Sequence, residues 1–166
     1  MKKILAIATL AVVILGCSGE NPSQIYREFK TQSKIEFQTG YVDDETQIPI
    51  ISTGENLVFK YTFAHEEEED IADDEHSEIF YFEVANGTTS FIYNSTEPES
   101  NEAIIAGYRR LCFCGFESYT LKKAVISTQK LNNTQWQVSF DVVFAGQYGS
   151  YPLKDSGTYK VTTGSL

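Results

Sequence analysis

Basic side chains are scarce in this chain, which has 13 lysine and arginine residues against 23 aspartate and glutamate residues and a net charge of −10. Phosphate backbones and anionic lipid headgroups repel a protein that is this acidic. The composition therefore argues against nucleic-acid binding and against purely electrostatic attachment to a membrane surface. A negative net charge favours solubility and the binding of cations.

Sequence signatures of catalysis are also missing. The chain has no Gly-x-Ser-x-Gly motif and no glycine-rich loop that would bind phosphate. Its only two histidines, His65 and His76, lie in one acidic segment. Nucleophilic catalysis has no support in this pattern, and we expect a non-enzymatic protein without catalytic residues.

The chain also lacks an apolar run that could cross a membrane as a helix. Residues 4–16 carry no charge and follow Lys2 and Lys3. This run is too short for a hydrocarbon core about 30 Å thick, which requires about 20 helical residues. A short apolar run behind a basic start is typical of a secretory signal peptide. The sequence therefore predicts that residues 1–16 are a signal that is removed.

The end of this run reads Ile14-Leu15-Gly16-Cys17 and is followed by polar residues. It resembles the lipobox of bacterial lipoprotein precursors, in which the cysteine receives a diacylglycerol and becomes the acylated first residue of the mature protein. The resemblance implies that Cys17 is lipidated and that the protein is anchored in the bacterial cell envelope. Ser18 resembles the pattern that is sorted to the outer membrane. Two or more acyl chains hold a protein stably to a bilayer.

The remainder of the 166-residue chain is long enough for one domain. Residues 18–24 have almost no apolar content, and residues 25–30 are ambiguous between a strand and a helical turn. We therefore predict a lipid-anchored tether over residues 17–32 and a single domain over residues 33–166.

Apolar and polar residues alternate with a period of two over most of that domain, and aromatic residues make up 13% of the chain. The alternation is strongest over residues 57–63 and 136–144, while residues 79–84 are apolar on both faces, which predicts a central strand. Asn86-Gly87 is typical of a β-hairpin. About nine short strands without an amphipathic helix predict an all-β fold, an antiparallel β-sandwich that is immunoglobulin-like in the loose sense. A small β-barrel is the alternative.

An acidic segment over residues 65–76 separates two strongly predicted strands and is longer than most hairpin connections. Its carboxylates suit Ca²⁺, which takes six to eight oxygen ligands, and its histidines suit Zn²⁺. Among so many acids, either histidine should have a raised pKa. The alternative is a solvated loop that keeps the sheet soluble. The candidate ligands are His65, Asp70, Asp73, Asp74, Glu75 and His76.

Cys112 and Cys114 lie two residues apart, so they would share one face of a strand at a Cα separation of about 6.7 Å. A disulfide between them would need a bulge, which Gly115 could support. Two thiolates could instead hold Cu(I) or Zn²⁺, or the pair could be buried thiols.

Tyr148 and Tyr151 lie in a predicted loop over residues 146–154. Exposed loop tyrosines serve the recognition of proteins or glycans, although these rings could also pack onto the end of the sandwich. Together the patterns favour a lipid-anchored binding or structural module with a protein or glycan partner. The alternative is a metal-binding envelope protein that uses the acidic segment.

Overall fold

The computed structural model describes residues 23–39, 45–65, 76–96, 104–112 and 117–163. These residues form nine strands, and none of them belongs to a helix that could span a bilayer. The all-β fold class is therefore confirmed. The strands are β1 (Gln24–Gln38), β2 (Ile48–Thr53), β3 (Asn56–Ala64), β4 (Ser77–Val84), β5 (Ser90–Asn94), β6 (Ala106–Leu111), β7 (Thr120–Asn132), β8 (Gln135–Gly146) and β9 (Gly149–Val161).

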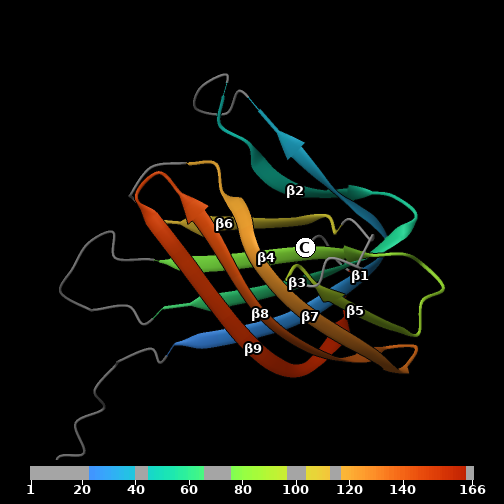
Figure 1. The fold of residues 1–166 in the computed structure, drawn as a ribbon. Helices are drawn as coiled ribbons and strands as arrows, with labels where there is room; N and C mark the ends of the chain where they lie inside the picture. Colours follow the sequence, from blue (N-terminus) through green and yellow to red (C-terminus); the bar gives the residue numbers. More distant parts are fainter. Residues whose placement is uncertain (1–22, 40–44, 66–75, 97–103, 113–116, 164–166) are drawn as a thin grey trace, which may run out of the picture.

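All nine strands belong to one sheet with the order β5-β7-β8-β9-β1-β3-β4-β6, and β2 pairs with β1 at its side. The sheet curls strongly into a half-barrel (Figure 1). Its pairs are antiparallel except for β1 and β9, which run parallel over a two-residue ladder. The sandwich-like layers are therefore two halves of one mixed sheet, which face each other because the sheet is curled.

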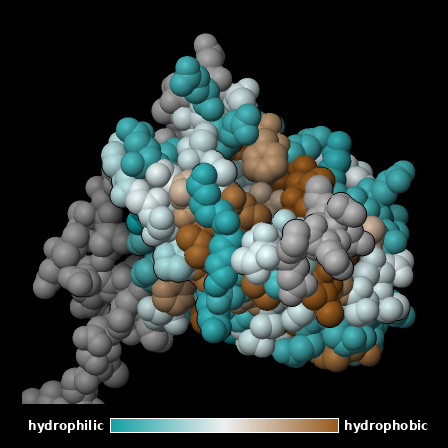
Figure 2. All heavy atoms as spheres, in the orientation of Figure 1, coloured by the Kyte–Doolittle hydropathy of each residue, from teal (hydrophilic) through white to brown (hydrophobic). Residues whose placement is uncertain are grey.

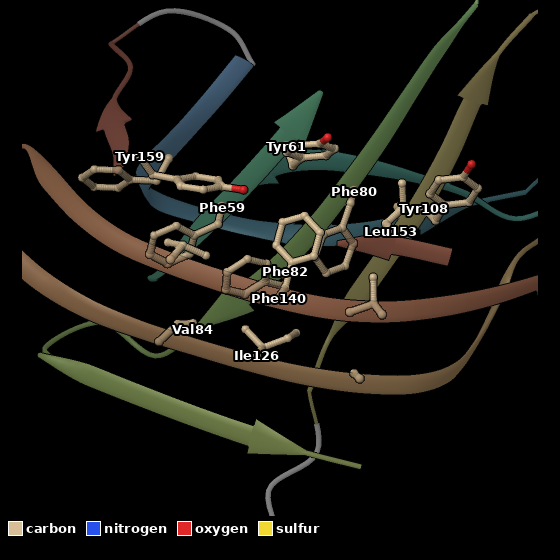
Figure 3. Close-up of a cluster of buried hydrophobic side chains, with 14 of the residues drawn as sticks. Phe59, Tyr61, Phe80, Phe82, Val84, Tyr108, Ile126, Phe140, Leu153 and Tyr159 are labelled. Atoms are coloured by element: carbon tan, nitrogen blue, oxygen red, sulfur yellow. The ribbon is translucent and has the colours of Figure 1, made fainter. Parts of the chain in front are cut away.

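Aromatic side chains from both halves fill the space between them (Figure 3). Phe59 of β3 stacks on Phe82 of β4 with ring centres 4.8 Å apart, and Trp136 of β8 meets Phe59 edge-on at 5.4 Å. Each such side chain contributes about 1.5–3 kcal/mol through burial. Every second residue of β8 from Trp136 to Phe144 is at most 2% exposed, as its alternation predicts.

Strand β4 is buried on both faces. Phe80 and Phe82 point into the main core, while Ile79 and Tyr81 pack with Val58 on the outer face. The strand lies between β3 and β6 in the sheet. The prediction of a central strand over residues 79–84 is therefore confirmed.

Strand β1 begins at Gln24, so residues 24–32 lie in the sheet and not in the predicted tether. Its first part pairs with β3, and its second part pairs with β2. The pairing with β3 shifts register between Lys30 and Ser33, where Gln32 has a φ of 52°. The first part of the strand precedes this bulge, and there Arg27 lies on the same face as Ile25 and Phe29, which is why the alternation of apolar and polar residues did not reveal it.

The Asn86-Gly87 turn is present, with Gly87 at a φ of 86°, but it does not close a hairpin. β5 pairs with β7, whereas β4 pairs with β3 and β6. The predicted hairpin is therefore wrong, because a local turn reverses the chain without selecting the partner of the strand that follows. The chain crosses here from one half of the sheet to the other.

Apolar and polar residues are interspersed on the face shown in Figure 2. The exposed large apolar side chains come from several segments, with Ile92 of β5 76% exposed and Leu131 of β7 53% exposed. A mixed surface of this kind is ordinary for a folded domain.

Candidate functional site

The two histidines face each other where β3 ends and β4 begins. Ala64 pairs with Ser77, and one step further the backbone N–H of His65 donates to the carbonyl oxygen of His76 at 2.8 Å. The two imidazole rings stack with centres 4.1 Å apart and planes within 5° of parallel. The sequence-predicted residues His65 and His76 therefore come together, while Asp70, Asp73, Asp74 and Glu75 lie outside the described residues.

Glu78 joins the two histidines. Its Oε2 atom lies 3.8 Å from Nε2 of His65, within the range of an ion pair but too long for a hydrogen bond. One ligand atom from each of the three residues lies within 4.8 Å of the others. Glu78 was not among the predicted ligands, because it lies two residues beyond the end of the acidic segment. The strand period was the available signal, since residues two apart share a face of a strand.

Arg110 of β6 lies beside the histidines because β6 pairs with β4 and places Arg110 opposite Glu78. Its Nε atom donates to Nε2 of His76 at 3.2 Å, and a second guanidinium nitrogen lies at the same distance. The guanidinium carbon is 4.9 Å from the ring centre of Tyr151, a cation–π contact. We refer to His65, His76, Glu78, Tyr108 and Arg110 as the polar cluster.

Burial lowers the pKa of His76, and the neighbouring His65 and Arg110 lower it further, while Glu78 opposes them. The expectation of a raised pKa is therefore wrong for His76. Burial, followed by the hydrogen bond to Glu78, raises the pKa of Tyr108. Tyr108 thus remains protonated and donates to Oε1 of Glu78 at 2.7 Å. This hydrogen bond fixes one oxygen of the carboxylate and leaves the other facing His65.

The two loop tyrosines have different surroundings. β9 starts at Gly149, so most of the predicted loop over residues 146–154 is strand, and Tyr148 lies in the tight turn with 75% of its surface exposed. Tyr151 packs edge-on against Tyr119 at 5.3 Å, and its hydroxyl donates to Glu117 at 3.0 Å. Of the two, Tyr148 remains accessible to a partner, while the ring of Tyr151 packs against Arg110.

Cys112 follows the end of β6 and is disulfide-bonded. Its partner and Cys114 lie outside the described residues, as does Cys17. A disulfide sulfur is not a thiolate, so Cys112 in this state does not supply the ligand that a Cu(I) or Zn²⁺ site on the cysteine pair would need.

Comparisons of the chain with family models, with curated proteins and with solved structures found no match.

Proposed function

We propose that this chain is a lipid-anchored protein of the bacterial cell envelope, at the outer membrane, and that its β domain is a non-enzymatic binding module. The observation that carries the anchor is the order of Lys2 and Lys3, the uncharged residues 4–16, and Cys17. β1 begins at Gln24. The segment from Cys17 to the start of the sheet spans at most about 25 Å when fully extended, so the domain would stay close to the membrane.

The binding role is supported by the polar cluster. His65 Nε2 is buried and makes no hydrogen bond, and it faces Glu78 Oε2. Side chains with unused donor and acceptor capacity at the ends of two packed strands are suited to a ligand. The exposed ring of Tyr148 adds a contact that a protein or glycan partner could use.

Replacement of the cysteine tests the anchor. The wild-type protein should partition into detergent and incorporate labelled fatty acid when it is expressed in a bacterium. Cys17→Ala should lose both properties, whereas the matched control Ser18→Ala should keep them. Retention of label and detergent partitioning by Cys17→Ala would exclude the anchor.

Metal binding is the second candidate function, and the proximity of His65, His76 and Glu78 favours it. A purely structural module should melt at the same temperature with a chelator, Ca²⁺, Zn²⁺ or Cu(I). A metal-binding protein should be stabilised, by about 2.7 kcal/mol when the ion is present at 100 times its dissociation constant. Thermal melts under these conditions separate the two functions.

A further inference from the structure

We infer that His65, His76 and Glu78 form a Zn²⁺ site, and that Arg110 occupies the ligand nitrogen of His76 until the ion displaces it. This inference rests on the second candidate function, metal binding, and specifies its ion and its ligands. It moves the site from the carboxylates inside the acidic segment to the two histidines at the ends of that segment and to Glu78 of β4.

The three ligand atoms are close to the spacing that zinc requires. Tetrahedral Zn²⁺ with bonds of about 2.0–2.2 Å places neighbouring ligand atoms about 3.4 Å apart. Nε2 of His65 lies 3.8 Å from Oε2 of Glu78, and all three ligand atoms lie within 4.8 Å of one another. A tilt of the stacked imidazole rings toward a common point would complete the site. The backbone hydrogen bond between His65 and His76 fixes the two ligand positions relative to each other.

Two of the ligand side chains, those of His65 and Glu78, already have surroundings that favour the binding of an ion. The Nε2 atom of His65 is buried without a hydrogen-bond partner, so a bond to metal would satisfy it. The other oxygen of Glu78 accepts a hydrogen bond from the Tyr108 hydroxyl at 2.7 Å. Carboxylates that bind metals are commonly oriented by hydrogen bonds of this kind.

The ligand chemistry favours zinc over calcium. Imidazole nitrogen with carboxylate oxygen is a typical zinc ligand set, whereas Ca²⁺ requires six to eight oxygens. Among the three side chains, only that of Glu78 carries oxygen atoms. Three protein ligands leave a fourth tetrahedral position open, which a water molecule or a group from a partner could take.

Arg110 competes with the ion. Its guanidinium group donates to Nε2 of His76 at 3.2 Å, and this hydrogen bond uses the lone pair that would bind a metal. Its positive charge also repels a cation at this distance. The side chain can swing away along the face of Tyr151, over which it already lies. Loss of the Arg110 charge should therefore strengthen metal binding. If Arg110 had no influence on the site, its replacement would leave the affinity for the metal unchanged.

A titration of the full-length protein in detergent with Co²⁺, followed by competition with Zn²⁺, tests the site. Visible absorption of Co²⁺ reports tetrahedral coordination, and the competition gives the Zn²⁺ affinity. His65→Gln, His76→Gln and Glu78→Gln should each weaken Zn²⁺ binding by at least about tenfold. Arg110→Gln should strengthen it by about tenfold, while Arg110→Lys, which keeps the charge, should strengthen it less.

The controls separate this inference from metal binding in general. Glu36→Gln removes an exposed carboxylate that pairs with Lys34 and should leave the affinity unchanged. Replacement of Asp70, Asp73 and Asp74 by asparagine and of Glu75 by glutamine should preserve tetrahedral Co²⁺ absorption. Far-ultraviolet circular dichroism checks that each variant is folded, and His65→Gln is the mildest of the ligand variants because the His65 side chain is 36% exposed.

Each outcome bears on a different claim. If the wild-type protein binds neither Co²⁺ nor Zn²⁺, both metal binding and this inference are wrong. If binding survives unchanged in His65→Gln and in Glu78→Gln, metal binding stands and the site assigned here is wrong. If Arg110→Gln binds Zn²⁺ no more tightly than the wild type, the displacement of Arg110 is wrong.

Discussion

Two arginines of the sheet, Arg27 and Arg110, have opposite surroundings. Arg27 of β1 donates from Nε and from a terminal nitrogen to both carboxylate oxygens of Asp155, at 2.7 and 2.6 Å. Arg110 of β6 contacts His76 and Tyr151 and forms no salt bridge with a carboxylate of the described residues. A bidentate pair fixes a guanidinium group, whereas a hydrogen bond to a neutral ring can be exchanged for another partner. Arg27 therefore stabilises the fold, whereas Arg110 can exchange its hydrogen bond to His76 for an interaction with a ligand.

The position of the Arg27–Asp155 pair explains its structural role. It connects β1 with β9, the two strands through which the halves of the sheet join (Figure 1). Their backbone ladder covers only two residue pairs, Glu28 with Lys160 and Phe29 with Val161. The side-chain pair therefore reinforces a junction that has few backbone hydrogen bonds.

Substitution of each arginine by methionine should separate the two roles. Arg27→Met leaves the Asp155 carboxylate, whose side chain is only 8% exposed, without its partner. We expect the free energy of unfolding to fall by about 3 kcal/mol. Arg110→Met should lower it by less than about 1 kcal/mol, since no buried carboxylate of the described residues loses a salt bridge. Urea denaturation of both variants measures the difference.

The partner variant sharpens this test. Asp155→Asn should cost less than Arg27→Met, because the Arg27 side chain is 28% exposed and can reach water once its partner is neutral. Equal losses for Arg27→Met and Arg110→Met would show that both arginines stabilise the fold, and the distinction between them would fail.

Gly157 provides a smaller test of the same junction. A Cβ atom at Gly157 would lie 2.5 Å from Nε of Arg27, so an alanine would push the guanidinium group away from Asp155. We expect Gly157→Ala to lower the free energy of unfolding by about 1–2 kcal/mol. The loss should shrink when Arg27 is already methionine, which a double-mutant cycle measures. Ser156→Ala is the matched control, and an unchanged loss in the Arg27→Met background would contradict the proposed cause.

The sequence predicted the parts of the fold in which one local pattern decides the outcome. The alternation over residues 57–63 and 136–144 predicted β3 and β8, because the burial of one face of a strand imposes a period of two. It missed the start of β1, where the charged side chain of Arg27 lies on the same face as Ile25 and Phe29. The hairpin predicted from Asn86-Gly87 is also wrong, because the order of the strands depends on packing across the whole sheet and not on one turn.

The candidate site was predictable only in part for the same reason. His65 and His76 could be grouped because they lie at the two ends of one acidic segment of the sequence. Glu78 could have been added from the strand period. Arg110 could not, since its place opposite Glu78 comes from the pairing of β6 with β4, which are far apart in the chain. No local pattern specifies which strand will supply the competing charge.

The dependence of the free energy of unfolding on pH tests the polar cluster through the smallest of the expected effects. His76 has a lowered pKa in the folded protein, caused by burial and then by His65 and Arg110, against an ordinary value of 6.5. Between the lowered pKa and about 6.5, the unfolded chain therefore binds a proton that the folded protein does not. The free energy of unfolding should rise with pH through this window and level off above it.

Urea denaturation between about pH 5.5 and 8 measures this slope, and His76→Gln provides the comparison because glutamine can still accept a hydrogen bond from Arg110. The variant should show a weaker dependence on pH than the wild type, with the difference largest in the acidic part of the range. Arg110→Gln should also weaken the dependence, since Arg110 is one cause of the lowered pKa. Identical slopes in all three proteins would show that the arginine does not act on His76, and the contrast with Arg27 would then rest on geometry alone.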